Sequence, residues 1–176
     1  KEITEVIFSG GDPLMASDNH LAWLVNKIEQ IPHVKRLRIH TRLPVVIPQR
    51  VTPTLVALLK NTRLKATMVL HINHGNEIDT ALADALEPLR EARIPLFNQS
   101  VLLKGVNDHV DILAELSEKL FDTGIQPYYL HMFDQMYDAM EKHLSHGPWK
   151  IEVDMNKGQD KIRSYYVSSL AAFWPA

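Results

Sequence analysis

Short apolar segments alternate with longer amphipathic segments along most of this chain. Five of the short segments are rich in β-branched or aromatic residues and recur about every thirty residues, which is typical of buried strands. The segments that we predict to be strands are Glu5–Ser9, Leu37–Arg42, Ala66–Asn73, Leu96–Leu102 and Pro127–Phe133.

The longer segments carry apolar residues at helical spacing, so each is predicted to be an amphipathic helix. Two also carry end signals: Thr52 is placed as an N-cap with Pro53 at the first helical position, and another helix begins near Asp108 and ends at Gly124. Strands alternating with helices predict an α/β fold with βαβ units and a parallel sheet. The apolar faces are Leu21, Leu24, Val25 and Ile28; Leu55, Leu58 and Leu59; Leu82, Leu86 and Leu89; and Ile112, Leu113, Leu116 and Leu120.

Polar residues gather where each predicted strand ends. In folds built from parallel strands, ligands bind at the C-terminal ends of the strands. A stabilising scaffold does not need carboxylates, imidazoles and amides at every strand end, so the pattern predicts one polar site with several contributors. The contributors are Ser9 to Asp12, His40 and Arg42, His71 to His74, Asn98 to Ser100, and His131 to Asp134.

The run from Ser9 to Pro13 follows the first predicted strand and is the most informative local sequence. Gly10 and Gly11 let the backbone approach a ligand closely and expose its N–H groups. With the carboxylate of Asp12 beside them, they suit a zwitterion such as an amino acid, whose amine and carboxylate each find a partner. The same run also fits a plain turn, and both interpretations stay open on the local sequence.

Composition limits the classes of protein that the chain fits. Its 176 residues, 45% of them hydrophobic, suit one domain with a buried core. A net charge of −2 gives no electrostatic case for nucleic acid or a membrane surface. There is no signal peptide and no apolar run of transmembrane length, so we expect a cytoplasmic protein. Five βα units are too few for an eight-stranded barrel, and the chain starts at Lys1 just before a strand, so we expect an excerpt of a longer protein.

Five motifs stand in order over about residues 1 to 135: SGGDPL (9–14), RIHTRLPVVIP (38–48), HINHGNEI (71–78), NQSVLLKGVND (98–108) and PYYLH (127–131). Each alone is weak, but the ordered set is specific. Together they resemble the lysine 2,3-aminomutase family of radical S-adenosylmethionine enzymes. Within that family, HINH and PYYLH followed by Asp134 are most similar to the members that make β-lysine for elongation factor P.

The resemblance implies an incomplete radical S-adenosylmethionine (β/α)6 barrel with five βα units over residues 1–135. The remaining residues, 136–176, lose the family pattern, and we predict a divergent, irregular C-terminal tail. The resemblance also implies three cofactors, which are a [4Fe–4S] cluster, S-adenosylmethionine and pyridoxal phosphate. The implied reaction moves the α-amino group of lysine to the β-carbon, and it needs a radical because it breaks an unactivated C–H bond. A homo-oligomer stays open.

Site residues follow from the same resemblance. The methionyl end of S-adenosylmethionine is implied to lie against Ser9, Gly10, Gly11 and Asp12, with His71 and Gln99 also lining it. Asp134 matches the aspartate that receives the side-chain ammonium of lysine, and a buried ammonium needs such a charged partner. No catalytic residue is assigned.

The chain also departs from the family. It contains no cysteine, so it offers no thiolate for the cluster, no disulfide and no cysteine nucleophile. Lys150, Lys157 and Lys161 stand in no glycine-rich context, so none is assigned to pyridoxal phosphate. We therefore expect these residues to be inactive alone. A non-catalytic remnant or small-molecule binding module stays open, as does a βα-barrel lyase or aldolase using Lys104 or Lys65.

Several polar residues have a structural interpretation beside the functional one. His71 and His74 on one strand would point to opposite faces, so we expect no metal site there. His40 and Arg42 share a strand face, and an anionic ligand and a plain strand end are equally open. The remaining expectations are that Tyr128 and Tyr129 are core and rim residues, that Asp108 is a helix cap, and that Asp134 has no capping role.

Overall fold

The computed structural model describes residues 3–133, 151–154 and 162–167. All five predicted strands are confirmed, each within two residues of its expected ends. They pair side by side in chain order, and every pair among them is parallel. Their bounds are β1 (Glu5–Phe8), β2 (Arg36–Thr41), β3 (Lys65–His71), β4 (Leu96–Val101) and β5 (Gln126–Phe133).

The four predicted helices are confirmed as α1 (Asp18–Glu29), α3 (Pro53–Asn61), α4 (Thr80–Glu91) and α5 (Val110–Asp122). Thr52 caps α3 as expected, since its hydroxyl accepts the Leu55 N–H at 3.0 Å. The cap expected at Asp108 is wrong by one residue: His109 caps α5 by accepting the Asp111 N–H through Nδ1. The chain also forms α2 (Leu43–Val46), η1 (Pro13–Met15), η2 (Pro48–Arg50) and η3 (Gly75–Glu77), which are too short to give a helical period.

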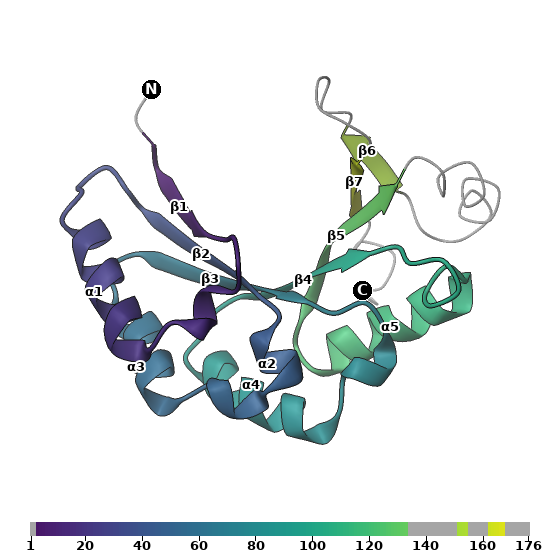
Figure 1. Ribbon diagram of the computed structural model, residues 1–176, viewed down its shortest axis with the longest axis horizontal. Helices are drawn as coiled ribbons and strands as arrows, with labels where there is room; N and C mark the ends of the chain where they lie inside the picture. The colour runs from purple at the N-terminus through teal and green to yellow at the C-terminus, as the bar shows by residue number, and fades with distance from the viewer. Residues whose placement is uncertain (1–2, 134–150, 155–161, 168–176) are drawn as a thin grey trace, which may run out of the picture.

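The helices all lie on one face of the sheet (Figure 1). The hydrophobic core lies between these helices and the sheet. Leu37 and Ile39 of β2 and Met68 and Leu70 of β3 are almost fully buried there. They pack with leucines from the predicted faces of α1, α3 and α4. Burying a side chain of this size stabilises the fold by about 1.5–3 kcal/mol. The apolar residues of the strands and those of the helices are therefore buried together in one core.

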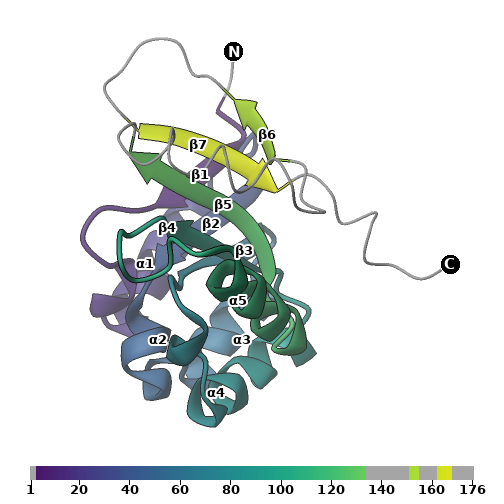
Figure 2. The same cartoon turned by 90° about the vertical axis from the view of Figure 1, so that its right-hand side faces the viewer.

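No helix of the described residues covers the opposite face, which we call the open face (Figures 1 and 2). Because side chains alternate along a strand, the residues between the buried ones point to it. Arg38, His40, His71 and Gln99 lie there, half-buried rather than enclosed. Among the described helices, none is long and apolar enough to cross a membrane.

The described part of the tail is not irregular, contrary to the sequence prediction. It contains β6 (Ile151–Asp154) and β7 (Ile162–Val167), which extend the sheet beyond β5. β7 pairs antiparallel with β5, and β6 pairs antiparallel with β7. β5 is the last parallel strand, and its outer edge offers N–H and C=O groups to another strand. The sequence of β7, with two tyrosines between Ile162 and Val167, favours a strand, although its period is not clean. The division at 135/136 stays a prediction.

Candidate functional site

The loop after β1 takes a backbone shape that only glycine adopts without strain. Gly10 has φ +89° and Gly11 has φ +58°, both in the left-handed region. A Cβ atom built on either residue would meet no other atom within 4 Å. Ser9, Gly10 and Gly11 are all exposed. The loop therefore presents open backbone at the C-terminal end of β1, as the sequence predicts.

Asp12 ends this loop, and its carboxylate accepts four hydrogen bonds from the protein. Oδ1 accepts the Thr41 hydroxyl at 2.6 Å and the Leu14 N–H at 3.0 Å. Oδ2 accepts the N–H groups of Arg42 at 2.7 Å and Leu43 at 3.0 Å. Because an ionised carboxylate offers about four acceptor positions, these bonds fill it. Asp12 thus ties the loop after β1 to the start of α2.

Arg42 continues this connection to the next strand end. Its guanidinium pairs with Oε2 of Glu77 in η3. The other oxygen of Glu77, Oε1, accepts the N–H groups of Asn73 at 2.8 Å and His74 at 3.0 Å. These two residues follow His71 within the loop after β3. The expectation that Arg42 shares a strand face with His40 is wrong, because β2 ends at Thr41.

The ends of β3 and β4 are joined by buried side-chain amides. Asn98 accepts the Ile72 N–H at 2.9 Å and donates to the Ile72 carbonyl at 3.0 Å. Asn107 is fully buried, accepts the Leu103 N–H at 2.6 Å and donates to the Asn73 carbonyl at 2.7 Å. Asn98 is therefore a structural residue on the helical face. The buried role of Asn107 was missed, because the sequence analysis interpreted only the neighbouring Asp108, as a helix cap.

Gln99 lies on the open face at these same strand ends, together with the histidines His40, His71 and His131. His71 and Gln99 are register partners on β3 and β4. The rings of His40 and His71 meet edge to face with their centres 5.9 Å apart. The Nε2 atom of His71 is buried and has no hydrogen-bond partner among the described residues. The structure thus brings together His71 and Gln99, and it adds His40.

The pKa values of these histidines are lowered, chiefly by burial. Burial lowers the pKa of His71; Asp12 opposes this shift and Arg42 adds to it. Burial also lowers the pKa of His40, with contributions from His71 and Arg38, against a hydrogen bond to Gln99. The pKa of His131 is lowered by burial and by His71. All three imidazoles therefore favour the neutral form.

The opposite end of the open face holds an ion pair and aromatic rings. The Arg38 guanidinium pairs with Glu5 of β1 at 2.8 Å. It also donates to the Tyr128 hydroxyl at 3.4 Å and lies 5.9 Å from the centre of that ring. The rings of Tyr128 and Phe97 have centres 5.2 Å apart. Tyr128 and Tyr129 are half-buried, so they line this face rather than the leucine core.

Metal ligation has no support in the described ranges. No group of three or more histidine, cysteine, aspartate or glutamate side chains in residues 3–133 and the two tail strands could hold a metal ion. His74 has another use: its Nδ1 accepts the Asn76 N–H at 3.1 Å and caps η3.

Comparison with known proteins shows which family the chain is similar to. No family model matches the chain. It is 62% identical to an L-lysine 2,3-aminomutase from Haemophilus influenzae over 138 residues, which are 78% of this chain and 41% of that protein. An L-lysine 2,3-aminomutase from Escherichia coli is 53% identical over 138 residues, 78% of this chain and 40% of the relative. The chain belongs to the lysine 2,3-aminomutase family.

Membership covers only part of the family's length. The chain spans about two fifths of the two relatives just named. A glutamate 2,3-aminomutase from Clostridioides difficile is also similar, 36% identical over 145 residues, 82% of this chain and 34% of that protein. The family relationship therefore includes proteins named for two different amino acids.

Three further residues considered from the sequence are Asp134, Lys65 and Lys104. Asp134 lies outside the described residues. Lys65 is the first residue of β3, at the edge of the sheet opposite His71. Lys104 is exposed in the loop after β4. Lys65 therefore does not supply the lysine that an aldolase would need at the C-terminal end of a strand.

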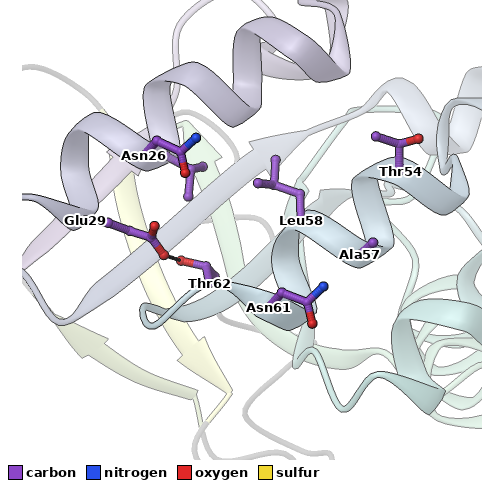
Figure 3. A pocket seen from close by; sticks show the side chains of 8 residues that line it. Asn26, Glu29, Thr54, Ala57, Leu58, Asn61 and Thr62 are labelled. Atoms are coloured by element: carbon purple, nitrogen blue, oxygen red, sulfur yellow. Dashed lines mark hydrogen bonds between the residues drawn. The ribbon is translucent and has the colours of Figure 1, made fainter.

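A separate hollow of about 320 Å³ lies on the helical side, between α1 and α3 (Figure 3). The Thr62 hydroxyl donates to Glu29 across one end of it. This bond and the Arg63 N–H lower the pKa of Glu29. None of the predicted site residues lines the hollow, whose walls are Val25, Asn26, Glu29, Thr54, Ala57, Leu58, Asn61 and Thr62.

Proposed function

We propose that this chain supplies the S-adenosylmethionine-binding strand ends of a radical S-adenosylmethionine lysine 2,3-aminomutase, built as an incomplete (β/α)6 barrel. The enzyme would convert L-α-lysine into β-lysine for modification of elongation factor P. The observation that carries the proposal is the buried Nε2 of His71, which has no hydrogen-bond partner among the described residues and stands beside Gln99. The open Gly10–Gly11 backbone follows β1 at the same C-terminal end of the parallel strands. The identity to aminomutases named for lysine supports the reaction.

The residues present fit the methionyl end of S-adenosylmethionine. Gly10 and Gly11 leave space at their Cα atoms, so a ligand can lie against the backbone there. Neutral His71 can donate or accept one hydrogen bond at Nε2, and the Gln99 amide offers both kinds of group. A zwitterionic amino acid needs this mixture. Four donors already occupy the acceptor positions of the Asp12 carboxylate. We therefore propose that Asp12 shapes the loop rather than forming a direct ion pair with the methionyl amine.

The chain has no thiolate for the family's [4Fe–4S] cluster, and none of the described residues is assigned to its pyridoxal phosphate. The 176 residues contain no cysteine, and a [4Fe–4S] cluster is held by cysteine thiolates. Lys65 is the first residue of β3 and Lys104 is exposed in the loop after β4, and neither is assigned to pyridoxal phosphate. Lys150, Lys157 and Lys161 lie outside the described residues. When bound, S-adenosylmethionine and these groups supply the radical chemistry, whereas the residues of this chain bind and orient.

The substrate rests on Asp134, which we propose as the partner of the lysine ammonium. A carboxylate attracts the ammonium of a lysine side chain and repels the carboxylate of a glutamate side chain. This position would therefore discriminate between the two amino acids for which the relatives are named. Losing a buried charged partner costs about 3–5 kcal/mol, which corresponds to a loss of about a hundredfold or more. Asp134→Ala should therefore impair the use of lysine much more than that of an analogue lacking the terminal ammonium. Equal losses for both would contradict the assignment.

A non-catalytic binding module on the same scaffold is the second candidate, because the chain lacks cysteine. A chimaera separates the two: the 138 matching residues replace their counterpart in the Haemophilus influenzae relative. The chimaera should bind S-adenosylmethionine after cluster reconstitution, and His71→Phe should weaken that binding about tenfold or more, while His20→Phe on α1 should not. A chimaera that carries the cluster, but whose affinity is the same with and without His71, would contradict the proposal.

A further inference from the structure

Three consecutive strand ends are joined in series by the side chains of Asp12, Arg42 and Glu77, of which the family resemblance assigns only Asp12. Asp12, after β1, accepts the backbone N–H of Arg42, after β2, at 2.7 Å. The guanidinium of Arg42 pairs with Glu77, and Glu77 accepts the Asn73 and His74 N–H groups that follow β3. Each contact is between residues about thirty positions apart or closes the loop after His71. The series therefore crosses from the glycine loop to the histidine cluster.

Arg42 is the one residue of this series that contacts both neighbouring loops. Its backbone N–H donates to the Asp12 carboxylate, and its guanidinium donates to the Glu77 carboxylate. Its side chain is 47% exposed and that of Glu77 is 21% exposed. An exposed pair of this kind contributes little to global stability, so its removal leaves the fold intact. Its effect is local, on the spacing of the loops.

We propose that Arg42 is a positioning residue that fixes the Gly10–Gly11 loop relative to His71, through Asp12 on one side and Glu77 on the other. The proposal rests on the proposed function, because the spacing matters for S-adenosylmethionine that contacts both places. Without the guanidinium, Glu77 loses its cationic partner and the turn after His71 is held by fewer contacts. A ligand that spans the glycine loop and His71 then binds to a less ordered site.

The charge of Arg42 gives this role a second, independent signature. His71 is faced by Asp12 and Arg42 from the adjoining loops, and by His40 and His131 from β2 and β5. Arg42 lowers the pKa of His71, whereas Asp12 raises it. Removing the guanidinium charge should therefore raise the pKa of His71. A residue that only supported the fold would not move this value while the protein stays folded.

The experiment compares Arg42→Gln, Arg42→Lys and the matched control Arg90→Gln, which breaks an exposed ion pair with Glu87 on α4. The pKa of His71 is measured by NMR titration in the 176-residue chain. Affinity for S-adenosylmethionine is measured in the reconstituted chimaera. Arg42→Gln should raise the pKa of His71 and weaken binding about fivefold to tenfold. Arg42→Lys should keep the pKa of His71 and the affinity for S-adenosylmethionine close to their wild-type values. Arg90→Gln should change neither the pKa nor the affinity.

Glu77→Gln tests the other end of the pair. It should weaken binding as Arg42→Gln does, and the double variant should be no weaker than either single one, because both remove the same interaction. Unchanged affinity in Arg42→Gln, or fully additive losses in the double variant, would overturn the role of Arg42. A wild-type chimaera that carries the cluster but does not bind S-adenosylmethionine would instead overturn the proposed function. The pKa of His71 would still report whether Arg42 acts on the cluster of histidines.

Discussion

At the scale of single residues, Asp12 shows how a motif residue can act through its neighbours. The sequence places it beside the two glycines, and the structure gives its carboxylate donors from Leu14, Thr41, Arg42 and Leu43. Three of these donors come from the next strand end. Only the β1–β2 register brings them together, so the local sequence could not reveal them. The joint location of His71 and Gln99 was predictable, since both follow from the strand-end rule.

Replacing Asp12 should destabilise the fold as well as the proposed cofactor loop. Asp12→Ala leaves four donors without their acceptor, and Asp12→Asn turns an amide NH2 toward two of them. Each variant should lower the free energy of unfolding by about 2 kcal/mol or more, measured by urea denaturation. Asp84→Asn, at an exposed position of α4, is the control and should change it by less than about 0.5 kcal/mol. Wild-type stability in Asp12→Asn would show that the four bonds contribute nothing.

The three histidines of the open face should make stability depend on pH. Their pKa values are lowered by burial from the ordinary value of 6.5, so the unfolded chain binds more protons than the folded one below that pH. Stability is therefore full above about pH 6.5 and falls as the solution is acidified toward the folded pKa values. The Tm should be lower at about pH 5.5 than at about pH 7.5. His40→Gln should reduce this difference, whereas His20→Gln, at an exposed position, should preserve it.

At the scale of elements, the period of apolar residues was enough to place five strands and four helices. Thr52 caps the start of α3 and Gly124 follows the end of α5, as the sequence predicts, because caps depend on local backbone chemistry. The short helix α2 was not predictable, since four residues show no period. The strands β6 and β7 were missed because their pairing depends on the free edge of β5 rather than on their own pattern.

Gly124 allows a direct test of helix termination. It has φ +71°, and a Cβ atom there would lie 2.5 Å from Nε of Arg90. Gly124→Ala should therefore destabilise the protein by about 1–2 kcal/mol, from the left-handed backbone and from displacement of Arg90. Gly105, with φ +73° and open space at its Cβ position, is the matched control. Gly105→Ala should cost about 1 kcal/mol, and a larger loss there than at Gly124 would contradict the explanation.

At the scale of the whole molecule, the chain holds a curved sheet with helices on one face and the candidate site on the other (Figure 1). It spans about two fifths of the relatives named for lysine. The polypeptide studied alone should bind no iron–sulfur cluster after anaerobic reconstitution, because it contains no cysteine. Iron retained in near-stoichiometric amount after desalting, with the absorption of a cluster, would contradict this.

If these residues function as the S-adenosylmethionine-binding part of a lysine aminomutase, they should support its reaction when the missing parts are supplied. The measurement is the formation of β-lysine from L-lysine by the chimaera, supplied with cluster, pyridoxal phosphate, S-adenosylmethionine and reductant. We expect β-lysine at a rate within about tenfold of the unaltered relative, and a loss of product in His71→Phe. A folded chimaera that holds its cluster and pyridoxal phosphate but forms no β-lysine would show that the assignment is wrong.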